Sequence, residues 1–421
     1  MHTEWEVAVI GGGASGLAAA VRTAQLGCRT VILERGERVG RKLLATGNGK
    51  CNLTNAQAAQ ITGHYFGTHP ERVEQALAHC PPSETTAFFR AIGLLTRTDA
   101  EGRVYPYSEQ ASAVLDVLRN AAQNAGVREQ CGFEVCAIER VRDGFVLHGA
   151  NGMRTTARAV IAACGGPAAP SNGGTELGAT LLRAMGHTII PQRPSLTPLR
   201  TDERLTRPLK GLRVKCAVAL QSNGKTVQRE HGELQFGDGQ LSGICVFQLS
   251  RKAGECLQSA QKVTLSVDLL PELSEQETAA LLEQRAAQLA QLPAEMYFTG
   301  LFAKKIGYEL MRPCVKDLSH RTVGTLTVQE RAQLAARCRA WAFPVTATGT
   351  YAAAQVTAGG ARLDQFDMRT MASKCVTGLF ACGELLDADG CCGGYNLQWA
   401  WSSGLLAARG AAAFCGKKVQ V

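Results

Sequence analysis

The chain has 421 residues, of which 45% are hydrophobic, and its 45 Lys and Arg against 36 Asp and Glu give a formal net charge of +9. This balance is typical of a soluble globular protein and excludes disordered, collagen-like and coiled-coil chains. At roughly 100–200 residues per domain, the length predicts two or three domains whose cores need no disulfides. The first residues carry no basic leader and no apolar run reaches the roughly 18 residues of a membrane span, so we expect a cytoplasmic protein without membrane contact.

The N-terminal segment has the pattern of a strand, a glycine turn and a helix. The apolar run 7–10 leads into Gly-Gly-Gly-Ala-Ser-Gly, in which Gly11, Gly13 and Gly16 match G-x-G-x-x-G. In this motif the first glycine makes the tight turn, the second lets backbone approach a pyrophosphate, and the third lets the helix pack on the strand. Glu34 ends the next apolar strand and is placed to bind a ribose hydroxyl, which argues against a 2′-phosphate. We therefore predict an adenine dinucleotide at the N-terminus.

A glycine-rich, basic segment at 40–55 follows the second predicted strand. Its glycines allow backbone NH groups to approach a ligand closely, and Arg41, Lys42 and Lys50 can hold phosphate. We predict a ligand loop here, with a plain surface loop as the alternative. Helices are predicted over 83–93 and, after a cap at Ser108, over 108–125.

Strands are predicted around 133–139, 144–148 and 159–163, and the last of them runs into a glycine turn at 164–167. In a doubly wound sheet such a turn lies outside the carboxyl ends of the strands, where ligands bind.

The character of the chain changes at about residue 191. Alternating segments at 212–221 and 226–236 are joined by Ser-Asn-Gly-Lys and predict a small antiparallel β unit. Capping boxes at 274–277 and 327–330 predict the starts of two helices. The predicted domains are 1–190 (first part of the nucleotide-binding domain), 191–270 (β-barrel-like substrate domain), 271–345 (helical insert) and 346–421 (second part of the nucleotide-binding domain).

The C-terminal part returns to the pattern of the N-terminus. A short apolar strand at 378–384 ends at glycine, and Gly393-Gly394-Tyr395-Asn396 precedes an alanine-rich helix that we expect to begin near Leu397. A glycine pair at a helix N-terminus can face an anion or a carbonyl group. We expect this segment to close the same nucleotide cleft from its far side.

The 16 cysteines, the eight histidines and the basic charge have ordinary explanations. The cysteines are scattered and form no Cys-x-x-Cys, so we expect buried thiols and no metal site, with a redox pair at Cys391 and Cys392 as the minor alternative. The histidines are expected on the surface or in the core. The excess charge lies mostly at 191–345, where 21 Lys and Arg against 15 Asp and Glu give +6. A solvated surface accounts for it better than a nucleic-acid partner or an anionic substrate.

Together these segments resemble a known group, the BaiN-like or YhiN-like family of bacterial NAD(P)/FAD-dependent oxidoreductases. The resemblance rests on 9–16, on 40–55 and on 378–403 with its Gly-Gly-Tyr-Asn-Leu-Gln-Trp-Ala, and extends through 102–106 and 164–166. It implies an α/β fold in which a Rossmann-like FAD-binding domain is formed by both termini and is interrupted by a β-barrel-like piece and a small helical insert.

The resemblance also implies non-covalent FAD as the cofactor, although the residues by themselves leave NAD possible. Glu34 and the glycine turn would hold the ADP half, and Asp387 and Asn396 would lie towards the ribityl chain and the flavin. The expected cofactor-binding residues are Gly11, Gly13, Ala14, Ser15, Gly16, Glu34, Arg35, Arg41, Lys42, Thr46, Gly47, Asn48, Gly165, Gly383, Glu384, Asp387, Gly394, Tyr395 and Asn396.

Activities known in the family differ, and include reduction of conjugated double bonds in 3-oxo bile acids and oxidation of aminoacetone. Our leading hypothesis is a reductase of a conjugated C=C in a small unsaturated carbonyl substrate, such as a steroid or bile acid. No second G-x-G-x-x-G follows a later strand, so NAD(P)H is expected to visit the flavin only transiently as electron donor. The alternatives are an oxidase or dehydrogenase of a small amine, and a flavin-bearing modifier of nucleic acid.

Reduction of an enone needs a donor that polarises the carbonyl and an acid that protonates the α-carbon. Tyr395 is the first candidate for such a catalytic donor, and a structural role for its hydroxyl is equally open. Tyr105, Tyr107 and Lys50 are weaker candidates.

Overall fold

The computed structural model describes residues 3–59 and 63–419. It divides into two compact units, unit 1 with Met1–Ser195 and Tyr351–Val421, and unit 2 with Leu196–Thr350. Each has its own apolar core. The division lies at 196 and 351, five residues after each of the boundaries at 191 and 346 that the sequence predicts. The first boundary falls later because residues 189–195 form a strand of unit 1. Within the described ranges, no helix combines the length and apolar character needed to cross a bilayer.

Unit 1 is built on a seven-stranded sheet with the order β7-β2-β1-β10-β9-β8, and β20 pairs with the last residues of β10, opposite β1 and beyond the part that pairs with β9. Pairing is parallel among the central strands and antiparallel where β9 and β8 extend the sheet. The central strands are continuous buried apolar runs, as expected for a parallel sheet covered on both faces. The predicted Rossmann-like α/β class is confirmed. The strands are β1 (Trp5–Ile10), β2 (Thr30–Glu34), β7 (Arg128–Cys131), β8 (Val135–Val141), β9 (Gly144–Gly149), β10 (Arg154–Ala162) and β20 (Leu379–Ala381).

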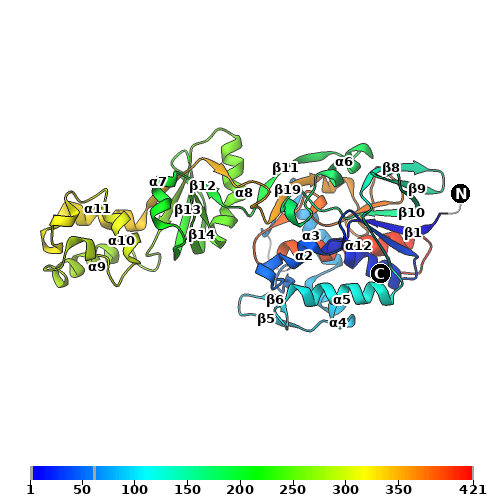
Figure 1. The fold of residues 1–421 in the computed structure, drawn as a ribbon, viewed down its shortest axis with the longest axis horizontal. Coiled ribbons are helices and arrows are strands. Elements are labelled where there is room, and N and C mark those ends of the chain that lie inside the picture. The colour runs from blue at the N-terminus through cyan, green and yellow to red at the C-terminus, as the bar shows by residue number, and fades with distance from the viewer. Residues whose placement is uncertain (1–2, 60–62, 420–421) are drawn as a thin grey trace. The chain divides into compact units, whose positions relative to one another are not determined.

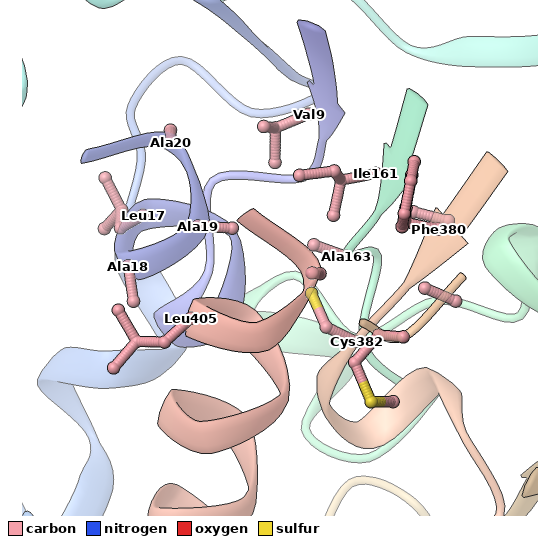
Figure 2. Packing of buried hydrophobic residues seen from close by; sticks show 14 of the residues in the cluster. Val9, Leu17, Ala18, Ala19, Ala20, Ile161, Ala163, Phe380, Cys382 and Leu405 are labelled. Carbon is pink, nitrogen blue, oxygen red and sulfur yellow. The ribbon is translucent and has the colours of Figure 1, made fainter. Parts of the chain in front are cut away.

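The first and last helices of the chain, α1 (Ala14–Gln25) and α12 (Tyr395–Phe414), pack against each other beside this sheet. Figure 2 shows side chains of α1 and Leu405 of α12 next to Val9 and Ile161 of the strands. The contact is close because α12 carries Gly404, where an added Cβ would lie 2.6 Å from the carbonyl oxygen of Ser15. Both ends of the chain therefore form one core.

The remaining helices of unit 1 surround this frame (Figure 1). The helix predicted over 83–93 is α4, and the one predicted over 108–125 is α5, but its expected cap at Ser108 is wrong because Gln110 holds the cap position. β6 pairs with β3 and β5 in one small sheet, β4 pairs with β21 in a second, and β11 pairs with β19 in a third. The bounds are α2 (Arg41–Leu44), β3 (Thr54–Asn55), β4 (Tyr65–Phe66), α3 (Pro70–His79), α4 (Pro82–Ala91), β5 (Thr96–Thr98), β6 (Arg103–Pro106), α5 (Ala111–Asn124), α6 (Leu177–Ala184), β11 (Ile189–Ser195), β19 (Val356–Ala361) and β21 (Asp389–Gly390).

Unit 2 contains an antiparallel sheet with the order β17-β16-β13-β14-β15-β12-β18. Its two end strands are joined by the single residue Thr346, so the sheet curves back on itself like the β-barrel-like piece that the sequence predicts. The predicted turn at Asn223-Gly224 closes the β13–β14 hairpin. The strands are β12 (Leu199–Arg200), β13 (Arg213–Ser222), β14 (Lys225–Phe236), β15 (Gln240–Ser242), β16 (Val263–Asp268), β17 (Trp341–Val345) and β18 (Ala347–Thr348).

Helices complete unit 2. α8 (Ile244–Gln258) packs on the sheet, and α9 (Glu275–Gln288), α10 (Lys304–Met311) and α11 (Val328–Arg339) group together in Figure 1. Both predicted capping boxes are present, at Ser274 with Glu277 and at Thr327 with Glu330. The local sequence signals therefore located these two helix starts.

Candidate cofactor site

A pocket in unit 1 opens at the carboxyl ends of β1, β2 and β10. The turn from β1 to α1, the start of α2, the turn after β10 and the first residues of α12 form its walls. This is the place where doubly wound sheets bind ligands. Of the predicted cofactor-binding residues, the pocket is lined by Gly11, Gly13, Ala14, Ser15, Glu34, Arg35, Arg41, Lys42, Thr46, Gly165, Glu384 and Asn396.

The three glycines of the motif differ in what surrounds them. Gly11 has φ +103°, and an added Cβ would lie 2.6 Å from the oxygen of Ala163, so the tight turn needs glycine. A Cβ on Gly16 would collide with the oxygen of Gly11, which keeps α1 close to β1. At Gly13 a Cβ would meet no atom of the described chain within 4 Å, because that position faces the open pocket.

Gly13 is also the N-cap of α1, and no side chain in the described part of the chain caps this helix. The amide groups of the first turn are therefore available to an anion, and the helix dipole favours one there.

Glu34 is held at the pocket wall by backbone groups. Its Oε2 accepts a hydrogen bond from Gly12 N at 2.8 Å, and its Oε1 accepts one from Gly36 N at 2.7 Å. A carboxylate has about four lone-pair positions, so both oxygens keep capacity for further donors such as ribose hydroxyls. The two backbone bonds fix the orientation of the carboxylate towards the glycine turn.

Lys42 lies near the pocket but is paired. Its ammonium contacts the Glu384 carboxylate at 2.8 Å, with 28% and 21% of the two side chains exposed. Glu384 Oε1 also accepts a hydrogen bond from Thr357 N at 3.0 Å. This ion pair joins the N-terminal and C-terminal parts of unit 1 and partly neutralises the positive charge that the sequence assigned to phosphate.

Two arginines connect the pocket wall to the turn that follows β10. The guanidinium of Arg41 donates to Ser171 O at 2.8 Å, and that of Arg35 donates to Gly173 O at 3.2 Å. Asn172 and Gly173 line the pocket beside them. Both arginines thus hold a loop that borders the site.

The other predicted residues lie outside the pocket lining, and two of them, Gly47 and Asn48, are exposed. Asp387 is only 2% exposed, and its Oδ2 accepts hydrogen bonds from Thr68 N at 2.8 Å and Thr68 Oγ1 at 2.6 Å. Gly383 and Gly394 have φ +73° and +100° and permit close contacts with Ser15 and Thr54. The residues of this group are Gly16, Gly47, Asn48, Gly383, Asp387, Gly394 and Tyr395.

Tyr395 begins α12 and is 6% exposed. Its ring stacks on His64 with centroids 4.3 Å apart, and the ring of Tyr65 meets it edge-on at 5.9 Å. The Tyr65 hydroxyl donates to Tyr395 O at 3.1 Å. Burial raises the pKa of Tyr395, so its phenol keeps its proton at neutral pH. The sequence assigned His64 no role, because nothing local indicates a stack between residues so far apart in the chain.

Asn396 acts as a connector at the start of α12. Its amide accepts from Gly390 N at 2.8 Å and donates to Gly390 O at 2.7 Å. The adjacent Cys391 and Cys392 are half-buried. Sequence reasoning missed several lining residues, among them Cys164, Gln355, Val356 and Trp399. Burial raises the pKa of Cys164 to about 12, which keeps it protonated. Cys164 belongs to the 164–167 turn that the sequence placed at the ligand-binding edge of the sheet, whereas the packing of distant segments brings Gln355, Val356 and Trp399 to the pocket.

Comparison with known proteins finds a family model and relatives that match nearly the whole chain. The family model of the HI0933-like protein Rossmann domain matches residues 5–410. The 3-dehydro-bile acid delta(4,6)-reductase of Clostridium scindens is 36% identical over 412 residues, covering 96% of this chain and 98% of that protein.

Two other relatives carry a different name. The ribosomal RNA dihydrouridine synthases of Haemophilus influenzae and Escherichia coli are each 29% identical, covering 94% and 95% of this chain and 95% and 96% of their own. Among solved structures, 3-ketosteroid delta1-dehydrogenase from Sterolibacterium denitrificans covers 97% of this chain and 99% of its own with a TM-score of 0.50 and 14% identity, a likeness of fold alone.

Proposed function

Because the chain belongs to the HI0933-like family of Rossmann-domain proteins, as its resemblance to the BaiN-like flavoproteins indicated, we propose that it is a FAD-dependent oxidoreductase that reduces a C=C bond conjugated with a carbonyl group. The observation that carries the proposal is the 36% identity to a bile-acid reductase over 96% of this chain. The geometry of the pocket agrees with it.

The residues present fit the ADP half of a dinucleotide. The open position at Gly13 leaves room for a pyrophosphate against the uncapped start of α1. Glu34, fixed by two backbone bonds, offers its remaining lone pairs to ribose hydroxyls. Lys42 and Glu384 together present a nearly neutral surface beside that path.

The other half of the pocket suits a planar apolar ring system. Leu397, Trp399 and Val356 contribute apolar surface, and Asn396 keeps the turn before α12 in place through its bonds to Gly390. Apolar walls exclude water and strengthen the polar contacts that remain. FAD, when bound, supplies hydride chemistry at its N5 atom.

The substrate that we propose is a small steroid-like enone or dienone, by analogy with the reductase from Clostridium scindens. Its carbonyl needs a hydrogen-bond donor and its α-carbon a proton. Tyr395, held neutral by burial and oriented by His64 and Tyr65, is our candidate for holding that proton. We further propose NAD(P)H as a transient electron donor.

A second candidate substrate is a uracil base in RNA. Two relatives that span nearly the whole chain are named ribosomal RNA dihydrouridine synthases. The double bond of uracil is also conjugated with a carbonyl, so one arrangement of residues would serve either substrate. The candidates differ in how the substrate is held, not in the bond that is reduced.

The experiment that tests the proposal follows the flavin absorbance of the purified protein without oxygen. We expect NADH or NADPH to bleach the flavin bands and a 3-oxo-Δ4 steroid to restore them. Restoration by a uridine-containing RNA, and not by the steroid, would select the second candidate. Bleaching by a small amine, with peroxide released in air, would replace both with an oxidase. A colourless protein that takes up no FAD would overturn the cofactor itself.

A further inference from the structure

One exposed face of unit 2 has no part in the proposed reduction. It lies on α10 and its C-cap residue Arg312, where Lys304, Tyr308 and Arg312 follow one another at spacings of four residues and Lys305 is adjacent to Lys304. Residues at this spacing share one side of a helix. The opposite side, with Ile306 and Leu310, is buried in the core of unit 2.

The α10 segment is strongly basic. Residues 304–316 contain Lys304, Lys305, Arg312 and Lys316 against the single acid Glu309, a net charge of +3. Glu309 is 8% exposed and pairs with Arg312 at 3.0 Å. The three lysines make no ion pair or side-chain hydrogen bond with any residue in 3–59 or 63–419. Their charge is therefore directed at solvent.

Unit 2 contains both paired and unpaired cations, and Lys225 and Lys262, outside α10, also have no acidic partner among the described residues. Many cations are neutralised by an acid nearby, and the pairs include Arg204 with Asp202, Arg213 with Glu233, Arg321 with Glu330, Arg331 with Glu283 and Arg339 with Asp268. The three lysines of the α10 segment lack such a partner, so they contribute directly to the net charge of the unit.

Arg337 adds an incompletely satisfied guanidinium beside this segment. It lies on α11, which packs on α10, and its guanidinium carbon is 5.6 Å from the centre of the Trp341 ring. Its Nε is buried and has no hydrogen-bond partner among the described residues. Burial lowers its pKa, whereas Cys314, Glu309 and Cys338 raise it and Arg312 adds a smaller lowering effect. An anion at this position would offset the cost of burying the guanidinium.

Tyr308 distinguishes this face from a simple patch of charge. Its side chain is 38% exposed, and it stands between the two lysines on one side and Arg312 on the other. An exposed aromatic ring surrounded by cations is the arrangement with which proteins stack unpaired bases and neutralise the adjoining phosphates. A membrane surface would instead call for a row of apolar side chains, and Tyr308 is the only large hydrophobic residue of α10 that is exposed.

We propose that this face, formed by Lys304, Lys305, Tyr308, Arg312 and Arg337, binds an unpaired segment of nucleic acid, with Tyr308 stacking on a base and the cations contacting phosphates. The inference deepens the second candidate of the proposed function, since it gives an RNA substrate a place to be held. It concerns binding alone.

The test uses the full-length, FAD-loaded protein and the fluorescence anisotropy of a labelled single-stranded RNA of roughly 12 nucleotides. Affinity is measured between about 50 mM and about 200 mM salt, because the slope of log K against log [salt] counts the phosphates that are neutralised. We expect the double variant K304Q/K305Q to reduce the magnitude of that slope by about 1.4, or about 0.7 for each phosphate contact.

The matched control is K225Q/K262Q. These two lysines are also exposed in unit 2, and the double substitution removes the same charge from the β13–β14 turn and the residue before β16. We expect it to leave the slope unchanged. An equal loss in both double variants would overturn the proposal, because it would show attraction by overall charge.

Tyr308 provides a second, independent readout. We expect Y308A to weaken RNA binding by about 5- to 150-fold and Y308F to restore it, as stacking requires a ring and no hydroxyl. Equal affinity of wild type and Y308A, or tighter binding of a duplex than of the single strand, would overturn the proposal. The affinity for single-stranded DNA of the same sequence is also measured. Equal affinity for DNA and RNA supports recognition of phosphates and bases, and higher affinity for RNA assigns the partner to RNA.

Binding is read without turnover, so its failure and that of the proposed function are distinguishable. A protein that binds RNA on this face and reduces no conjugated double bond would refute the reductase alone. A protein that reduces steroid enones and does not bind the single strand would refute the present inference alone.

Discussion

Substitution of Gly13 by alanine separates cofactor binding from folding. The backbone at Gly13 has φ −79° and ψ −168°, which alanine adopts without strain, and the new Cβ would meet no described atom within 4 Å. Alanine is a poorer N-cap than glycine, but it also reduces the entropy of the unfolded chain, and these effects offset each other. We therefore expect the unfolding free energy of the FAD-free protein to change by less than about 0.5 kcal/mol.

The affinity for FAD should fall much further. A methyl group at Gly13 would occupy the space through which a pyrophosphate reaches the first amides of α1. Loss of one hydrogen bond to a charged group costs about 1.5–3 kcal/mol, which corresponds to about 10- to 150-fold in the dissociation constant. Calorimetric titration of the deflavinated protein with FAD measures this, and denaturant unfolding measures its stability.

The control for this experiment is Gly404→Ala on α12. Its Cβ would be 2.6 Å from the oxygen of Ser15, so it forces α1 and α12 apart and should cost about 1–3 kcal/mol of stability. If G13A binds FAD as tightly as wild type, or loses as much stability as G404A, our assignment of the glycine turn is refuted.

Three further predictions concern single interactions. Glu384→Gln removes the charge that neutralises Lys42 while keeping an acceptor for Thr357 N, and should lower the free energy of unfolding by about 1–2 kcal/mol. The control is the double variant Lys42→Met/Glu384→Gln, which should recover part of this loss when both are measured by denaturant unfolding. Asp387→Ala should cost about 2–3 kcal/mol because two donors of Thr68 lose their buried acceptor, and a melting temperature equal to that of wild type would contradict this. The ion pair with Arg321 lowers the pKa of Glu330 to about 2. The ionised Glu330 therefore contributes about 1–3 kcal/mol to the free energy of unfolding at a pH above its unfolded-state pKa of about 4.5, and this contribution is lost as pH falls towards 2. The stability difference between wild type and Glu330→Gln, which retains the capping box, should therefore shrink between pH 5 and about pH 2, and a difference independent of pH would refute that assignment.

Local patterns in the sequence specified the elements that depend on neighbours in the chain. The order of strand, glycine turn, helix and acid-terminated strand predicted β1, α1 and β2, because this order is readable from adjacent residues and Gly16 meets the backbone of Gly11 within the motif. The capping boxes at Ser274 and Thr327 and the turn at Asn223 were also readable, since each needs only a few adjacent residues. The predicted Ser108 cap was wrong because α5 begins at Ala111, with Gln110 at the N-cap and no side-chain cap hydrogen bond.

Only the tertiary structure decided which distant groups meet. Lys42 and Glu384 are 342 positions apart, and no periodicity indicates that they form an ion pair instead of a free phosphate ligand. The stack of His64 on Tyr395 and the buried bonds of Asp387 to Thr68 likewise depend on how α12 and its preceding turn pack into the N-terminal part of unit 1. The sequence by itself determined the elements and the nucleotide motif, because short-range sterics and hydrogen bonds control them. Charge pairing, burial and the outline of the pocket arise from contacts between segments far apart in the chain, and those were set by packing.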